Sequence, residues 1–110
     1  MEVLEVRDGE AAVKKLDGDR AVMAVLLDAG GKVYDSEAFA EWLGEQRDRG
    51  TRELFFVCGD ADGFPGELRQ RVKHKLSLSA MTYSHELARV MLAEQIYRAF
   101  AILSGSPYPK

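Results

Sequence analysis

The chain has 110 residues, of which 46% are hydrophobic and 30% are charged, and its formal net charge at pH 7 is −3. This balance is typical of a globular protein and excludes an intrinsically disordered chain. The net negative charge argues against a protein that holds nucleic acid by bulk charge alone. The length predicts a single domain over residues 1–110.

The first half of the chain begins with an alternating segment, Val3–Val6, which predicts a strand and has neither the basic start nor the apolar stretch of a signal peptide. A short helix is expected over Glu10–Leu16. The continuous apolar run Ala21–Leu27 predicts a parallel strand that is covered on both faces, and it is too short to span a membrane. Asp28–Gly31 is expected to be a loop.

The middle of the chain predicts a further helix, strand and helix. Ser36 is a good N-cap for a helix over Glu37–Arg47. Glu53–Cys58 reads as a second buried strand, and its cysteine is the only one in the chain, so no internal disulfide can form and a cytoplasmic protein is expected. The glycine-rich loop Gly59–Gly66 precedes a helix expected over Glu67–His74.

The last third predicts a short strand, Leu76–Leu78, and a long helix that is capped by Ser84 and ended by Gly105. This helix is apolar almost all round, whereas an ordinary surface helix has one apolar stripe. A chain this short cannot easily bury such a helix alone, which predicts a partner subunit. Its large apolar residues are Leu87, Val90, Met91, Leu92, Ile96, Tyr97, Phe100, Ile102 and Leu103.

The alternation of strands and helices predicts an α/β fold with a mainly parallel sheet. Ligand sites in such sheets form beyond the carboxyl ends of the strands. Three segments follow predicted strands: Leu27–Gly31, Gly59–Gly63 and Leu78–Tyr83. Each glycine alone fits a tight turn, but three such segments together favour a site. The pattern is neither a Walker A loop nor a dinucleotide fingerprint, which argues against a phosphate site.

Other polar residues have simpler interpretations. Asp60 and Asp62 lack further carboxylates at ligand spacing, so no metal site is expected. His85 favours a structural hydrogen bond over a catalytic role, and Cys58 is expected to be buried. A basic cluster is either a solvated helix face or a contact to RNA phosphates; it comprises Arg69, Arg71, Lys73 and Lys75.

Several longer motifs together resemble the RlmH family of SPOUT-superfamily methyltransferases. The resemblance runs from Glu2 to Lys110. Its most specific parts are Leu27–Lys32, Phe56–Gly63, Leu76–Thr82, Glu94–Ala99 and Pro107–Tyr108.

The resemblance implies a trefoil knot at the C-terminal end of the α/β domain, a homodimer, and methyl transfer from S-adenosylmethionine to the ring N3 of a pseudouridine in large-subunit ribosomal RNA, with the assembled ribosome as substrate. It places Tyr108 and Lys110 on the RNA step, with His85 as a second-rank candidate. The residues that it implies for the cofactor pocket are Leu27, Gly59, Leu78, Ser79, Ala80, Met81, Thr82 and Tyr83.

The sequence also departs from the family pattern. The family's first strand and helix have no counterpart before Glu2, and its paired glycines become Gly59-Asp60. The family's proline before His85 is Ser84, and its C-terminal histidine is replaced by Pro109. Two alternatives therefore stay open: a degenerate homologue that binds cofactor or RNA without methyl transfer, and a ribosome-associated dimerisation module.

Overall fold

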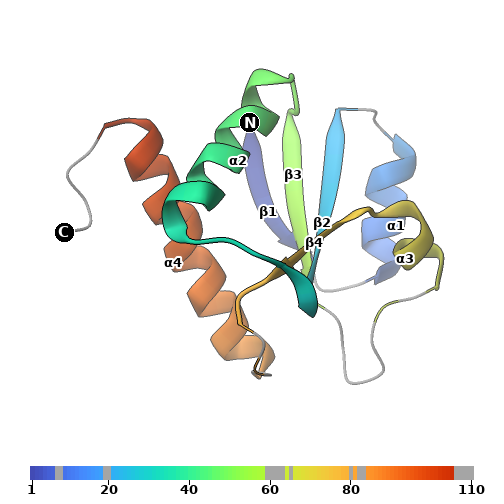
Figure 1. The fold of residues 1–110 in the computed structure, drawn as a ribbon. Helices are drawn as coiled ribbons and strands as arrows, with labels where there is room; N and C mark the ends of the chain where they lie inside the picture. The colour runs from blue at the N-terminus through green and yellow to red at the C-terminus, as the bar shows by residue number, and fades with distance from the viewer. Residues whose placement is uncertain are drawn as a thin grey trace.

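The structure, a computed structural model, describes residues 1–6, 9–18, 21–58, 64, 66–79, 81 and 84–105. Strands and helices alternate along the chain, as the sequence predicted (Figure 1). The elements are β1 (Glu2–Val6), α1 (Gly9–Gly18), β2 (Val22–Val33), α2 (Ser36–Asp48), β3 (Glu53–Cys58), α3 (Gly66–Arg71), β4 (His74–Ser77) and α4 (His85–Leu103).

The described strands form one parallel sheet in the order β1-β3-β2-β4. Helices α2 and α4 cover one face of the sheet, and α1 and α3 cover the other (Figure 1). This arrangement confirms the predicted α/β fold with a mainly parallel sheet. The predicted trefoil knot depends on segments outside the described residues and stays a prediction.

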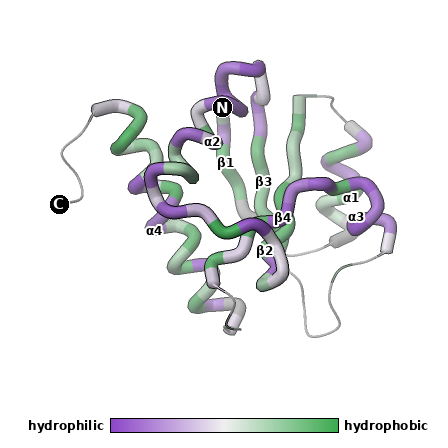
Figure 2. The backbone as a smooth tube through the Cα atoms, viewed as in Figure 1, coloured by the Kyte–Doolittle hydropathy of each residue, from purple (hydrophilic) through white to green (hydrophobic). Residues whose placement is uncertain are grey.

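The central strands β2 and β3 carry side chains into both layers of the core. Val25 and Phe56 point into the cluster beneath α2 and α4, whereas Leu26 and Phe55 point into the cluster beneath α1 and α3. Successive side chains of a strand alternate between faces, so only a strand covered on both sides can be apolar throughout. Figure 2 shows these strands as hydrophobic segments in the middle of the molecule.

Strand β2 is longer than predicted, because the expected loop Asp28–Gly31 is an excursion within the strand. Leu27 pairs with Leu76 of β4, and Lys32 then pairs with the same residue after a register shift. The Asp28 carboxylate accepts a hydrogen bond from the Gly30 amide at 3.0 Å. This local turn lets β2 leave its pairing with β4 and return to it. The polar and glycine residues of the segment indicate a turn, but they do not indicate that the strand continues after it.

Helix α1 extends beyond the predicted Glu10–Leu16 at both ends, and further differences concern α2 and α3. The N-cap of α2 is Asp35, whose carboxylate accepts from the Ala38 amide at 2.7 Å, and not Ser36, which is the first helical residue. Helix α3 ends at Arg71, before the expected His74. The boundaries of α4 are confirmed, since Ser84 is its N-cap and Gly105 follows its end with a φ of +75°.

Candidate functional site

The candidate site lies where β3 and β4 reach their carboxyl ends and where β2 leaves its pairing with β4 after Leu27. Leu27 of β2 pairs with Cys58 of β3 on one side and with Leu76 of β4 on the other. These three residues therefore lie side by side across the sheet, Cys58 at the end of β3 and Leu76 next to the end of β4. The sequence predicted that these strands place their carboxyl ends together, and binding of a ligand there stays a prediction.

The excursion of β2 passes very close to β4 at this edge. A Cβ atom built on Gly31 would lie 2.7 Å from the carbonyl carbon of Lys75 and 2.9 Å from the amide nitrogen of Leu76. No side chain fits in that space without moving the backbone. Glycine at this position therefore allows β2 to return to β4, and it fixes the path of the segment that follows Leu27.

The end of β4 is held by short-range hydrogen bonds. The buried Ser77 hydroxyl donates to the Ser79 carbonyl at 2.9 Å, and the Ser79 hydroxyl oxygen accepts from the Met81 amide at 3.1 Å. Leu78 is half-buried between them, while the Met81 side chain is 74% exposed. The small-polar sequence thus folds the chain tightly beside Leu78 and presents Met81 to solvent.

A cavity of about 290 Å³ opens beside Leu78, on the face of the sheet covered by α2 and α4. The Ser36 hydroxyl donates to the Gln95 side-chain oxygen at 2.7 Å across it, tying the start of α2 to α4. The remaining lining is apolar apart from the Asp35 carboxylate and Ser77. The residues that line the cavity are Tyr34, Asp35, Ser36, Phe39, Leu76, Ser77, Leu78, Met91 and Gln95.

Sequence reasoning did not assign Asp35, Met91 or Gln95 to the site. Asp35 was overlooked because Ser36 also satisfies the pattern of an N-cap. Met91 and Gln95 lie four residues apart, so they share one face of α4. This spacing could have indicated that the two residues act together. Because α4 is apolar almost all round, however, its sequence does not indicate which face lines the cavity.

The predicted site residues fall into two groups. Leu27 pairs with Leu76 within β2 and β4, and Leu78, Ser79 and Met81 follow the end of β4 at Ser77. The first residue of α4 is His85, but its side chain is outside the described part of the chain. The predicted site residues that lie outside the described residues altogether are Gly59, Ala80, Thr82, Tyr83, Tyr108 and Lys110.

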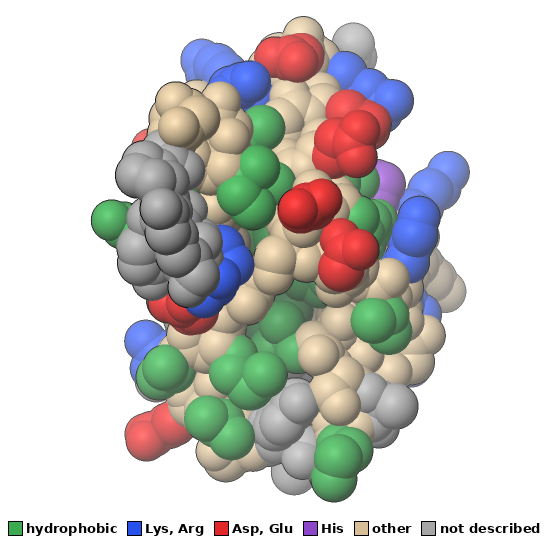
Figure 3. All heavy atoms as spheres, turned by 60° about the vertical axis from the view of Figure 1, so that its left-hand side comes forward, with side chains coloured by type: hydrophobic (Ala, Val, Ile, Leu, Met, Phe, Trp, Pro, Cys, Tyr) green, Lys and Arg blue, Asp and Glu red, His purple; other side chains and the backbone are tan. Residues whose placement is uncertain are grey.

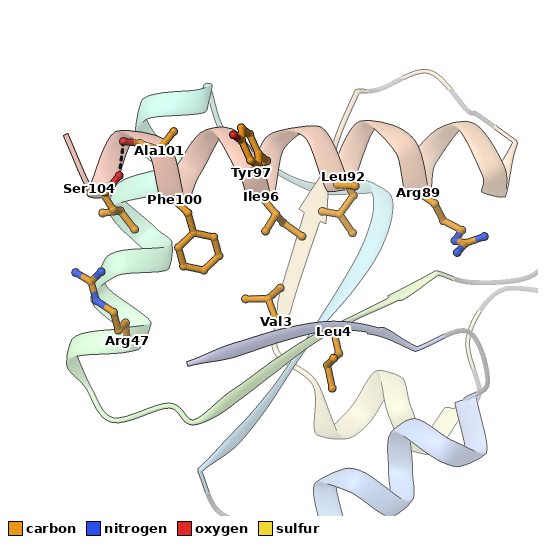
Figure 4. Close-up of a pocket in the computed structure, with 12 residues that line it drawn as sticks. Val3, Leu4, Arg47, Arg89, Leu92, Ile96, Tyr97, Phe100, Ala101 and Ser104 are labelled. Carbon is orange, nitrogen blue, oxygen red and sulfur yellow. Dashed lines mark hydrogen bonds between the residues drawn. The ribbon is translucent and has the colours of Figure 1, made fainter. Parts of the chain in front are cut away.

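A larger hollow of about 790 Å³ lies elsewhere, between α4 and the edge strand β1 (Figure 4). Leu92, Ile96 and Phe100 of α4 point into it from one side, and Val3 of β1 points into it from the other. None of the predicted site residues that the structure describes lines it. Its lining is mostly apolar, with Arg47, Arg89, Tyr97 and Ser104 as the polar residues among those described.

Two further features of the described residues bear on the kind of site present. No helix in the described part of the chain is long and apolar enough to cross a membrane. Within the same residues, no three or more histidine, cysteine or carboxylate side chains gather as they would around a metal ion.

Comparison with known proteins gives one consistent family. A family model described as a predicted SPOUT methyltransferase matches residues 2–109. A protein of Trichlorobacter lovleyi named "Ribosomal RNA large subunit methyltransferase H" is 46% identical over 102 residues, which cover 93% of this chain and 65% of that protein. The protein of the same name from Allorhizobium ampelinum is 49% identical over 86 residues, which cover 78% of this chain and 54% of that protein.

A third relative with that name, from Rhizobium etli, is 52% identical over 84 residues, which cover 76% of this chain and 52% of the relative. The chain thus spans between half and two thirds of the length of these curated relatives.

Proposed function

Because the chain belongs to the SPOUT methyltransferase family, we propose that it transfers a methyl group from S-adenosylmethionine to the ring N3 of a pseudouridine in large-subunit ribosomal RNA. The observation that supports this proposal is the alignment of Leu27, Cys58 and Leu76 across three neighbouring parallel strands. The substrate follows the name of the relatives, which are ribosomal RNA large subunit methyltransferases. The reaction takes place on assembled ribosomes in the cytoplasm.

The residues at this edge fit the proposed cofactor. Leu27 and Leu78 offer apolar contact to a flat ring. Gly59 lies outside the described residues, but a glycine after Cys58 would allow a ligand to approach the backbone closely. Among the described residues that line the adjacent cavity, Asp35 supplies a carboxylate and none has a basic side chain. Such a lining suits a cationic group better than a phosphate, which agrees with the absence of a phosphate-binding motif.

When bound, S-adenosylmethionine supplies a methyl group that its sulfonium already makes electrophilic. The protein must align the target nitrogen with that methyl, and positioning of this kind can lower a barrier by several kcal/mol. Residues 78–83 would hold the cofactor. Tyr108 and Lys110 would orient the base and help the N3 proton to leave, with His85 in a supporting role.

A homodimer formed through α4 is part of this proposal. Several large apolar side chains of α4 remain exposed, including Val90 at 67% and Tyr97 at 62%. The apolar hollow beside β1 extends the same surface (Figure 4). An exposed apolar surface of this extent is typical of a protein interface, and a second copy would bring its C-terminal tail towards the first copy's cofactor site.

The test is a methyl-transfer assay on assembled ribosomes with radiolabelled S-adenosylmethionine, accompanied by calorimetry of cofactor binding. We expect the label to enter large-subunit RNA at a pseudouridine. Cofactor binding without transfer would instead support the degenerate homologue. If neither binding nor transfer is detected in a folded dimer, the chain is a dimerisation module.

A further inference from the structure

A small aromatic pocket lies between α2 and the outer strand β4. Trp42 is 6.3 Å from Tyr34 and 5.9 Å from His74 between ring centroids, and both pairs are tilted. Trp42 also stacks on the buried ring of Phe39, at 6.2 Å and 16° between the ring planes. The pocket has a volume of about 130 Å³. That is well below the roughly 300 Å³ of a typical small-ligand site, but it can hold one flat ring.

The aromatic pocket, as we call it, has a positively charged rim. Lys32, Lys73 and Lys75 join His74 in its lining, and no carboxylate is found among the described residues that line it. Lys32 also places its ammonium group 4.9 Å from the centre of the Tyr34 ring. In a chain whose net charge is −3, this is a local concentration of positive charge.

The structure divides the basic cluster that the sequence predicted. Arg71 forms an ion pair with Asp17 of α1 at 2.6 Å, and Arg69 lies 6.0 Å from the centre of the Phe64 ring. Both arginines are thus engaged on the α1 and α3 side of the sheet. Lys73 and Lys75 are exposed and line the aromatic pocket.

Helix α2, which borders the aromatic pocket through Phe39 and Trp42, carries an acidic row. Glu37, Glu41 and Glu45 are exposed and follow each other at four-residue spacing, so they form one row along α2. Figure 3 shows acidic side chains gathered beside a histidine and several basic side chains. A polyanion is therefore repelled from α2 and attracted towards β4.

The aromatic pocket borders the candidate site. Tyr34, Phe39 and Leu76 line both this pocket and the cavity beside Leu78. Strand β4 also leads directly from His74 to the end of the sheet at Ser77. A ligand in the aromatic pocket is thus next to the proposed place of methyl transfer.

We propose that the aromatic pocket accepts an unpaired base of the RNA substrate that neighbours the methylated nucleotide, while Lys73 and Lys75 contact the adjoining phosphates. The proposal rests on the proposed function, since it assigns a second contact to the same RNA. Proteins read single-stranded RNA by stacking unpaired bases on aromatic side chains, and they orient its backbone with basic ones. A base inside a duplex is already stacked and cannot enter so small a pocket.

The aromatic pocket contains its own probe, because Trp42 is the only tryptophan of the chain. We would titrate the protein with a short oligouridylate and follow the fluorescence of Trp42. A base that stacks there should quench the fluorescence saturably. A blunt RNA duplex and inorganic polyphosphate, which supply charge without a free base, should quench it much less.

Three variants test the two parts of the contact. His74→Ala should weaken oligouridylate binding by about fivefold or more, as expected for the loss of a stacking partner. Lys73→Ala and Lys75→Ala should each reduce the slope of log affinity against log salt by about 0.7. Lys14→Ala removes an equally exposed lysine from α1, on the other face of the sheet, and serves as the matched control.

The results separate this inference from the proposed function. Equal quenching by polyphosphate, or His74→Ala binding the oligouridylate as well as the wild type does, would overturn the aromatic pocket as a base site. If ribosomes are still methylated in that case, the proposed function stands without it. Conversely, specific quenching that is lost in His74→Ala supports the pocket even if no ribosomal RNA is methylated.

Discussion

The path of β2 through the candidate site depends on the absence of a side chain at Gly31. A methyl group there would meet the backbone of Lys75 at 2.7 Å, and backbone cannot rotate away as a side chain can. We expect Gly31→Ala to lower the free energy of unfolding by about 1–3 kcal/mol, the usual cost of overpacking. Urea denaturation measures this change.

Gly30 provides the control for that substitution. A Cβ atom on Gly30 would have Asp28 Oδ1 as its nearest neighbour, at an ordinary contact distance of 3.7 Å. Gly30→Ala should therefore change stability by less than about 0.5 kcal/mol. Equal effects of the two substitutions would mean that β2 does not approach β4 as described.

Asp35 carries a second residue-level prediction. Its carboxylate accepts from the Ala38 amide, so Asp35→Ala should cost about 1 kcal/mol of stability through the loss of the N-cap. Asp35→Asn keeps an acceptor and should restore most of that loss. If the alanine variant unfolds at the same urea concentration as the wild type, α2 is not capped in this way.

The choice between Asp35 and Ser36 shows what residue patterns could not decide. Both are good N-cap residues, and they are adjacent in the sequence. Ser36 instead donates to Gln95, which is 59 positions away in the chain. The sequence pattern predicted an N-cap near Ser36. The packing of α4 against α2 determines which of the two residues caps the helix.

At the scale of elements, α4 allows a sharper test of the dimer than the sequence did. Val90 is 67% exposed on α4, so Val90→Glu should leave the subunit folded and convert the dimer to a monomer. Val33 is 65% exposed on β2, and Val33→Glu is a matched control that should leave the dimer intact. Light scattering measures both, and a wild-type monomer at micromolar concentration would reject the proposal.

Ile96 tests the side of α4 that packs towards the core and the hollow beside β1. It is only partly buried but packs against the core cluster beneath α2. Ile96→Glu should therefore destabilise the subunit itself, by about 2 kcal/mol or more, because it places a charge against an apolar core. Circular dichroism during thermal unfolding distinguishes this outcome from simple loss of the dimer.

The central strands were predicted more accurately than the edge strand β4, and the reason is physical. The apolar runs of β2 and β3 are covered on both faces, so composition alone indicated them. Strand β4 begins at His74, two residues before its predicted start. The sequence pattern missed these two residues because β4 is an edge strand and their side chains are exposed. Such a segment lacks the apolar run by which the central strands were found.

At the scale of the whole molecule, the candidate site combines segments that no local pattern could join. The alternation of elements predicted a parallel sheet, but not the order β1-β3-β2-β4. Pairing of Leu27 with both Cys58 and Leu76 depends on that order. The roles of Gly59, Tyr108 and Lys110 came from family resemblance and remain predictions.

The C-terminal tail gives the prediction that belongs to this scale. Deletion of residues 107–110 should leave S-adenosylmethionine affinity within a few-fold of the wild type and abolish methyl transfer to ribosomes, because Tyr108 and Lys110 are proposed to act on the RNA step. Calorimetry and the transfer assay measure the two effects. A truncated protein that methylates ribosomes as fast as the wild type would exclude a role for the tail.

The order of the strands also has a kinetic consequence. Strand β1 pairs with β3, and β2 pairs with β4, so each pair joins strands that are far apart in the sequence. Forming either pair closes a long loop of chain before any strand contacts are made. Parallel sheets with such distant partners fold slowly, typically over milliseconds to seconds. We therefore expect refolding on the order of a second in stopped-flow experiments. During that interval the unpaired apolar strands β2 and β3 are exposed, and newly made chains are at their most prone to aggregate.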